Sequence, residues 1–389
     1  MDLDVAEHDV AFREEVRTWL AEHGPTGARP RSGEAMRAFD TAWQRAQWEG
    51  GWAGINWPVD YGGRGLSLLQ QVIWYEEYAT LGLPGIDACF VGNNHAGPTL
   101  ISRATAAQKE LHLPPILRGD VVWAQGFSEP EAGSDLAALR TRAEIDGDEL
   151  VVNGQKVWTS FADVADWQEL LVRTDPDAPR HKGLTWVICD MRGPGVDVRP
   201  IATMDGGRDF AEVFYDDVRI PLSNVVGRVN DGWSVAMSTL SFERGTAFTA
   251  SQVRLADRVD QLVELARQRI LPGQHRPAIH DDEIAHQLAT ARAEVAALRS
   301  MTYAGVSRNA RQEEPGPEGS ILKLFYAELS QRVARLALDI LGAEALELDP
   351  SGDDDWQHEY LVSYSLSIGG GTSEIMRNII GERVLGLPR

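Results

Sequence analysis

Hydrophobic residues recur at helical spacing in the first part of the chain, up to about Gly119. The run from Phe12 to Leu20 places its apolar residues on one helical face, and the run from Leu69 to Leu81 does the same. A loop rich in Pro, Gly and Arg, Gly24–Gly33, separates the first two helices. The pattern predicts an N-terminal segment built from helices.

The pattern changes after Gly119 to short segments in which apolar and polar residues alternate. Two turn signals, Asp146-Gly147 and Asn153-Gly154, lie between such segments, and both predict β-hairpins. Leu184–Met191 and Ala211–Val218 have the composition of further strands. Residues 120 to about 230 are therefore expected to form a β domain.

Helical periodicity returns from Trp233 onward. The segment that begins at Ile321 carries a wide apolar stripe of a buried helix, which runs to Ile340. The loop Glu313–Gly319 and the acidic stretch Asp349–Asp355 separate the C-terminal helices.

The order helical, β, helical predicts a protein of the α+β class with three consecutive domains. We expect an N-terminal helical domain at residues 1–120, a central β domain at 121–232 and a C-terminal helical bundle at 233–389.

Composition excludes several classes of function. The 389 residues include 37 basic and 58 acidic side chains, a net charge of −21, which disfavours binding to nucleic acids or anionic membrane surfaces. The chain starts on acidic residues rather than on a signal region, and no apolar run reaches the ~20 residues of a membrane span. Its two cysteines, Cys89 and Cys189, form no CxxC pair, and no spacing suggests a metal site. We expect a cytoplasmic enzyme.

Three segments could take part in chemistry. Gln125–Asp135 gathers small residues and hydroxyls that could approach a heterocycle or a phosphate, although it also fits a simple turn-rich connection. Trp158–Ser160, at a strand end, could cover a planar ring, or could be a core tryptophan before a turn. Ser367–Arg377 is a glycine-rich entry to a helix, where anionic groups often bind.

Taken together and in this order, the segments resemble the acyl-CoA dehydrogenase family. Trp57–Gly63 (WPVDYGG), Ser128–Asp135, Asn153–Trp158 and Gly371–Asn378 are the motifs in question, so the resemblance spans nearly the whole chain. It implies an N-terminal helical domain, a central barrel-like β domain and a C-terminal four-helix bundle. It also implies FAD as cofactor, in dimers or tetramers with flavin sites at subunit interfaces.

The resemblance implies roles for single residues. Gln125 to Ser134 would line the flavin pyrimidine ring and pyrophosphate, Trp158 would lie against the isoalloxazine, and the Ser160 hydroxyl would hydrogen-bond flavin N5. The complete set of implied FAD-binding residues is Gln125, Phe127, Ser128, Gly133, Ser134, Trp158, Thr159, Ser160, Arg269, Gly342, Thr372, Ser373 and Glu374. The implied substrate-binding residues are Ser134, Phe242, Arg244, Gly370 and Gly371.

The sequence departs from the family at the catalytic base. Many members have a glutamate directly before the last Gly-Thr pair, where this chain has Gly370. A second branch, with the isovaleryl and long-chain enzymes, has its glutamate on an earlier helix before an arginine. Glu243, followed by Arg244, matches that place and is the candidate base. The alternative is that Glu243 only stabilises a helix N-terminus and Arg244 is a surface charge.

A second departure concerns the cross-subunit flavin contact. Relatives often have an arginine followed by an aromatic residue and glycine, but Leu271 and Pro272 follow Arg269 here. Gly342 lies in a stretch that matches the family only in part. His95 is interpreted as a structural histidine, with a place in the acyl pocket as the alternative.

The resemblance implies α,β-dehydrogenation of an acyl thioester, carried by CoA or by a carrier protein. Glu243 would take the α-proton and flavin N5 the β-hydride, with an electron-transfer flavoprotein as electron acceptor. A homodimer or homotetramer is expected, and a heteromer is the other arrangement considered. The missing side chain at Gly370 suggests room for a branched, cyclic or steroid-like acyl group. Three alternatives stand beside this hypothesis: a related flavin monooxygenase or oxidase, a non-catalytic partner subunit of a heteromeric enzyme, and a helical scaffold without cofactor.

Overall fold

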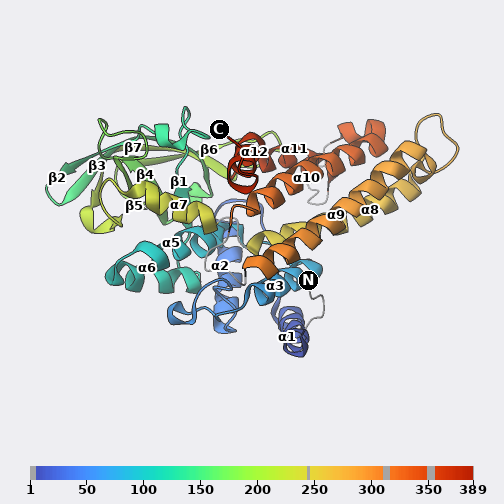
Figure 1. The fold of residues 1–389 in the computed structure, drawn as a ribbon, viewed down its shortest axis with the longest axis horizontal. Coiled ribbons are helices and arrows are strands. Elements are labelled where there is room, and N and C mark those ends of the chain that lie inside the picture. Colours follow the sequence, from blue (N-terminus) through green and yellow to red (C-terminus); the bar gives the residue numbers. More distant parts are fainter. Residues whose placement is uncertain (1–5, 243–245, 310–315, 348–354, 389) are drawn as a thin grey trace. The chain divides into compact units, whose positions relative to one another are not determined.

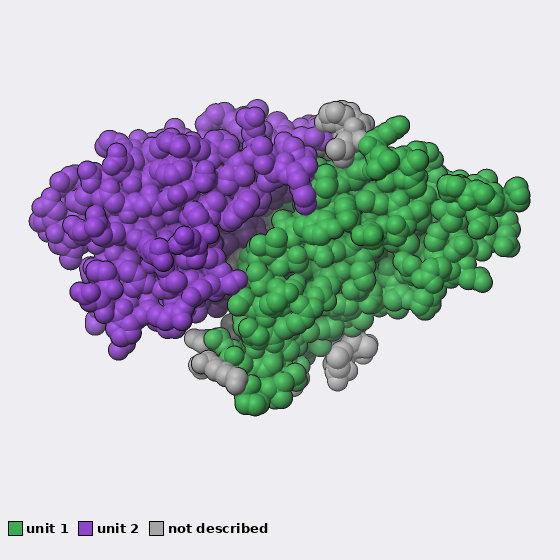
Figure 2. All heavy atoms as spheres, turned by 90° about the horizontal axis from the view of Figure 1, so that it is seen from above, with its two compact units in different colours: residues 1–21, 67–82, 244–389 green, residues 22–66, 83–243 purple. Residues whose placement is uncertain are grey.

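The computed structural model describes residues 6–242, 246–309, 316–347 and 355–388. Their contacts divide the chain into two compact units (Figure 2). Residues 22–66 and 83–243 form one, called the β unit here. Residues 1–21, 67–82 and 244–389 form the other, called the helical unit.

The β unit is built around one sheet (Figure 1). Its strand order is β6-β7-β3-β2-β4-β5-β8, with β1 paired to β4. Most neighbours are antiparallel, whereas β1 and β2 run parallel to β4. The strands are β1 (Trp123–Gly126), β2 (Arg142–Asp146), β3 (Glu149–Ser160), β4 (Trp167–Arg173), β5 (Leu184–Asp190), β6 (Val196–Ile201), β7 (Phe210–Pro221) and β8 (Val225–Val226). The predicted strands at Leu184–Met191 and Ala211–Val218 correspond to β5 and β7.

One of the two predicted hairpin turns is wrong. Asp146-Gly147 does join β2 to β3, as predicted, but Asn153-Gly154 lies inside β3 at a bulge. Gly154 has φ of 150°, and a Cβ there would come within 2.7 Å of the Thr141 backbone. The Asn153 side chain exchanges two hydrogen bonds with Asp217 on β7, at 2.9 and 3.0 Å. The asparagine and glycine therefore serve a bulge and a cross-strand clamp rather than a chain reversal.

Helices α2 (Gly33–Glu49), α4 (Asp87–Val91), α5 (Gly97–Arg103), α6 (Ala106–Arg118) and α7 (Gly232–Phe242) complete the β unit. Trp57, from the WPVDYGG motif, is buried among them and donates its indole N–H to the Asn93 carbonyl at 2.8 Å. A Cβ at Gly63 would lie 2.0 Å from the Trp57 carbonyl oxygen, and a Cβ at Gly97 would lie 2.0 Å from the Trp57 ring. The motif is thus explained locally by close packing around one tryptophan.

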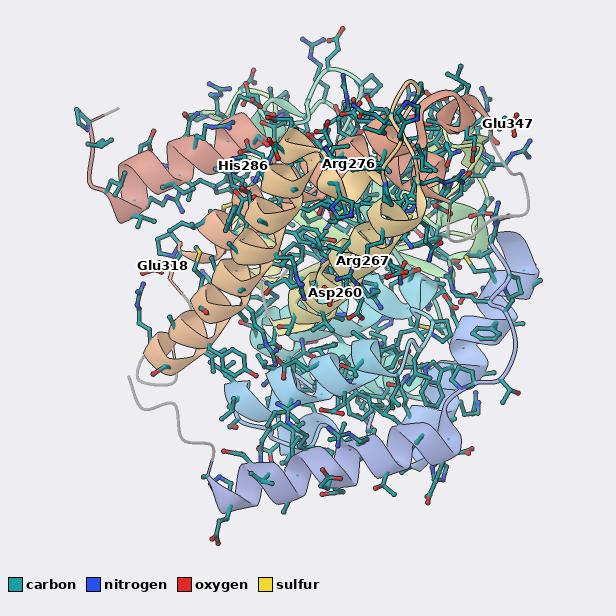
Figure 3. All side chains as sticks on the ribbon, turned by 90° about the vertical axis from the view of Figure 1, so that its right-hand side faces the viewer. Asp260, Arg267, Arg276, His286, Glu318 and Glu347 are labelled. Atoms are coloured by element: carbon teal, nitrogen blue, oxygen red, sulfur yellow. The ribbon has the colours of Figure 1, made fainter. Side chains whose placement is uncertain are left out.

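The helical unit contains most of α1 (Glu7–His23), with α3 (Leu68–Thr80), α8 (Thr249–Gln268), α9 (Asp282–Asn309), α10 (Gly319–Leu341), α11 (Trp356–Leu366) and α12 (Ser373–Ile379). Its core lies between α8, α9 and α10. Figure 3 labels Asp260 and Arg267 on α8 and His286 on the adjacent α9. Asp260 pairs with Arg292 of α9 at 2.9 Å.

A buried acidic pair ties three helices of this unit together. Glu76 and Glu77 on α3 are each only 3% exposed. Arg13 on α1 contacts both carboxylates, at 2.8 and 2.5 Å, Arg17 contacts Glu77, and Arg299 on α9 contacts Glu76 at 2.9 Å. The arginines balance charges that would otherwise be costly to bury.

The predicted succession of a helical, a β and a second helical segment is confirmed. The predicted helices at Leu69–Leu81 and from Ile321 correspond to α3 and α10, and the Gly24–Gly33 loop lies between α1 and α2. The acidic stretch Asp349–Asp355 falls almost entirely outside the described residues. Among the described helices, none combines the length and the apolar character that crossing a membrane requires.

Candidate active site

Two of the three candidate segments meet in the β unit. The backbone N–H of Val157, next to Trp158, donates to the carbonyl of Ser128 at 3.0 Å. The neighbouring Lys156 ammonium donates to the carbonyl of Phe127, also at 3.0 Å. These two bonds join the loop after β1 to the C-terminal end of β3, so segments about 30 residues apart in the sequence form one surface.

Trp158 exposes its indole on that surface, and its backbone is strained. Its φ is 61°, a conformation that bulky side chains seldom adopt, and 57% of the residue is exposed. The ring makes an edge contact with Phe210, with centroids 5.9 Å apart. Ser128 and Ser160, on the two joined segments, are half-buried rather than sealed in the core. An accessible indole, with Ser160 two residues further along β3 and Ser128 bonded through its carbonyl to the neighbouring Val157, fits a planar heterocycle such as an isoalloxazine ring.

Two other predicted cofactor residues have buried side chains. Phe127 is 4% exposed within the core, and Thr159 is fully buried, its hydroxyl without a hydrogen-bond partner among the described residues. Any contact of these two with a cofactor would come from the backbone. Gly133 and Ser134 lie in an exposed turn, and the next residue, Asp135, forms an ion pair with Arg180.

A buried ion pair lies under the joined segments. The Lys156 ammonium contacts Glu129 Oε1 at 2.8 Å, with Lys156 fully buried and Glu129 8% exposed. Burial lowers the pKa of Lys156 to about 8, against the opposing charge of Glu129. Burial alone would raise the pKa of Glu129, but Lys156 and the backbone N–H groups of Arg140 and Thr141 hold it below its usual range. The pair anchors the loop that carries Ser128 to the strand that carries Trp158.

A second polar cluster, which no sequence motif indicated, adjoins Gln125. Glu169 lies opposite Gln125 in the parallel pairing of β1 with β4 and is fully buried. The Gln125 amide nitrogen lies 2.8 Å from Glu169 Oε1 and 3.3 Å from Nδ1 of His95. The one signal in the sequence was an acidic residue, beside Gln168, in a strand that continues with Leu170, Leu171 and Val172.

The helical unit contains the third segment, after α11. Gly370 and Gly371 have φ of 65° and 97°, in the left-handed region that favours glycine, and Lys323 of α10 donates to the Gly371 carbonyl. Thr372 caps α12 by accepting from the Ile375 N–H at 3.2 Å. Ser373, the first residue of α12, is buried and Glu374 is exposed.

Arg269 and the Gly342 region also come together in the helical unit. The Arg269 guanidinium makes a bidentate contact with Glu344, at 2.7 and 2.6 Å, two residues after Gly342. Both terminal nitrogens of the Arg269 guanidinium are therefore bonded to one carboxylate. No motif in the sequence indicated Glu344.

The candidate base and its neighbour, Glu243 and Arg244, lie outside the described residues. The helix that leads to them, α7, is described up to Phe242, which is half-buried. The hydroxyl of Thr239 on α7 is 2.9 Å from that of Thr99 on α5, so α7 is fixed within the β unit.

Three family profiles match the chain in order. They are the N-terminal, middle and C-terminal domains of acyl-CoA dehydrogenase, over residues 6–120, 124–218 and 230–385. The chain is 41% identical over 386 residues to the acyl-CoA dehydrogenase IpdE1 of Mycobacterium tuberculosis, with 97% of each chain covered. It is 40% identical over 395 residues to IpdE1 of Mycolicibacterium smegmatis, again with 97% of each covered.

Solved structures agree with the sequence comparison. The Tcur3481-Tcur3483 steroid ACAD superimposes with a TM-score of 0.85 at 32% identity, with both chains covered completely. The ChsE4-ChsE5 complex from Mycobacterium tuberculosis gives a TM-score of 0.85 at 33% identity, also with complete coverage.

Proposed function

The chain belongs to the acyl-CoA dehydrogenase family, and we propose that it is an FAD-dependent enzyme that desaturates an acyl-CoA thioester between the α- and β-carbons, with Glu243 as base. The observation that supports this most is the exposed Trp158 indole, held at positive φ on the same surface as Ser128 and Ser160.

Dehydrogenation requires the protein to supply a base and to orient the hydride acceptor. The thioester carbonyl makes the α-hydrogen weakly acidic, and Glu243, placed after α7, would take it as a proton. FAD, when bound, supplies the acceptor for the hydride that leaves the β-carbon. Trp158, Ser128 and Ser160 would orient the acceptor, so that both hydrogens leave from one aligned geometry.

Gly370 supports the choice of base. Glu243 remains the candidate base because Gly370 has no side chain that could abstract a proton. The φ of 65° at Gly370 also favours glycine over glutamate. The chain therefore fits the branch with its base on the earlier helix.

The same residue bears on the substrate. We propose a bulky, polycyclic acyl group of the steroid type, because Gly370 projects no side chain and a structure 32% identical to this chain is described as a steroid ACAD. Short straight-chain thioesters should then give low kcat/KM. A preference for butyryl-CoA over every cyclic thioester tested would refute this.

We further propose that the chain assembles with a second chain of the same fold and passes electrons to an electron-transfer flavoprotein. Val362, Tyr364 and Ile368 leave apolar surface exposed on and after α11, between 38% and 64% of each residue. Because Arg269 is paired with Glu344, its guanidinium would be less available for a cross-subunit flavin contact between identical copies. One similar structure is described as the ChsE4-ChsE5 complex, and the description of the other joins two names, Tcur3481 and Tcur3483. Native mass spectrometry of the chain alone and after co-expression tests this.

Glu243→Gln tests the base. General base catalysis contributes about 10²–10⁴-fold, so flavin reduction by a thioester should slow by at least about 100-fold while FAD remains bound. Glu264→Gln on α8, an exposed carboxylate of the helical unit, is the matched control and should react at the wild-type rate. Wild-type reduction by Glu243→Gln would exclude Glu243 as the base.

A further inference from the structure

Gln125, Glu169 and His95 form a hydrogen-bonded cluster in the β unit. Glu169 is fully buried and His95 is 5% exposed, whereas Gln125 is only half-buried. The three residues come from three different elements: β1, β4 and a π-helical turn at Gly92–Ala96. Such turns are rare and often occur at functional sites.

Glu169 determines which way the Gln125 amide points. The Gln125 amide nitrogen donates to Glu169 Oε1 at 2.8 Å, so the NH₂ group points toward Glu169 and the amide oxygen points away from it. The parallel pairing of β1 with β4 sets Gln125 directly beside Glu169. A rotated amide would place oxygen against oxygen, and the buried carboxylate opposes that strongly.

The second amide hydrogen is also used inside the protein. His95 Nδ1 lies 3.3 Å from the same Gln125 nitrogen, and an NH₂ group can only donate, so Nδ1 acts as the acceptor. With both N–H bonds committed to Glu169 and His95, the group that Gln125 has left for a ligand is its carbonyl oxygen.

We propose that Glu169 and His95 are positioning residues that make Gln125 an obligate acceptor for an imide N–H, the one donor on the pyrimidine edge of oxidised flavin. This inference rests on the proposed function, since it assumes that Gln125 lines the flavin. With flavin bound at Gln125, only the Gln125 side chain would separate it from Glu169, and an ionised Glu169 would make reduction of the flavin less favourable.

The test measures FAD affinity and the midpoint potential of bound FAD in the purified assembly. Glu169→Gln keeps an acceptor oxygen but lets the Gln125 amide rotate and removes the charge. FAD should bind at least about fivefold more weakly, as for one lost hydrogen bond, and its potential should rise. Glu212→Gln is the matched control, because Glu212 accepts from Gln155 at the same 2.8 Å in the same unit. It should change neither quantity.

A reversed pair separates positioning from folding. Gln125→Glu alone sets two carboxylates together and should lose FAD. Combined with Glu169→Gln, the new amide donates to the new carboxylate, which restores an acceptor toward the flavin. FAD binding should then recover to within about tenfold of wild type, as expected when the hydrogen bonds are remade, with a potential below that of Glu169→Gln.

The outcomes are distinct. Wild-type protein that binds no FAD would overturn the proposed function itself. Wild-type protein that binds FAD, with Glu169→Gln unchanged in both affinity and potential, would overturn this inference alone. A reversed pair that folds, by circular dichroism, yet binds FAD no better than Gln125→Glu would also overturn it.

Discussion

Replacing Lys156 by Met should destabilise the β unit strongly. The Lys156 ammonium donates to the Phe127 carbonyl at 3.0 Å and to Glu129 Oε1 at 2.8 Å, and its side chain is fully buried. Methionine fills similar volume but leaves Glu129 as a buried charge with only the backbone N–H groups of Arg140 and Thr141, at 2.6 and 2.8 Å. Removing one partner of a buried pair costs about 3–5 kcal/mol.

The lower end of that range is expected here, because Lys156 itself is costly to bury, as its pKa of about 8 indicates. For a unit of this size about 3 kcal/mol lowers Tm by roughly 6–12 °C. Thermal melting followed by circular dichroism measures this, with the exposed Lys182→Met as control.

The double variant makes the reasoning refutable. Adding Glu129→Gln to Lys156→Met removes the orphaned charge and should restore at least half of the lost Tm, a coupling that a double-mutant cycle measures. If the Tm of Lys156→Met lay within about 2 °C of the wild-type Tm, the claim that a buried, unpaired Glu129 is costly would be refuted. A double variant that melts as low as the single one would show that lost packing, not charge, is responsible.

Three further predictions concern other parts of the chain. Burial alone would raise the pKa of Glu77, but its bonds to two arginines lower that pKa overall. Ionised Glu77 therefore stabilises the folded protein at a pH above its ordinary pKa, and this contribution to stability is lost as the pH falls. The Tm difference between Glu77→Gln and wild type should therefore shrink as the pH is lowered from about 7 to about 3, and a constant difference would contradict this. Gly97→Ala should cost about 1–3 kcal/mol by collision with Trp57, whereas Gly305→Ala, in open space on α9, should leave Tm unchanged or raise it slightly. Trp158→Ala should weaken FAD binding about tenfold in a fluorescence titration, through loss of an aromatic contact; unchanged affinity would place the flavin elsewhere.

The sequence predicted the fold well, because period and turn chemistry are local properties. Apolar spacing located α3 and α10, and alternation located β5 and β7. The failure at Asn153-Gly154 has a clear cause, since the same dipeptide suits a hairpin turn and a bulge. The contacts that favour the bulge, with Asp217 64 residues away and with the Thr141 backbone, depend on tertiary structure.

The candidate site was predicted less completely. Motif resemblance selected Trp158 and Ser160, and the structure adds that the indole is exposed and strained. The motifs could not reveal that Glu344 lies beside Arg269 or that Glu169 lies beside Gln125, because those pairs depend on the tertiary structure. The roles of all these residues, and the domain boundaries at 120 and 232, remain predictions.

The most direct test is the visible spectrum of the purified protein during anaerobic titration with acyl-CoA thioesters, polycyclic ones included. A flavin absorbance band that bleaches with one of these thioesters, and with Glu243→Gln bleaches at least about 100-fold more slowly, is the predicted result. The partner chain is included if it co-purifies, and FAD is added to saturation. A fully loaded flavoprotein that dithionite reduces but no thioester bleaches would contradict the assignment as a dehydrogenase.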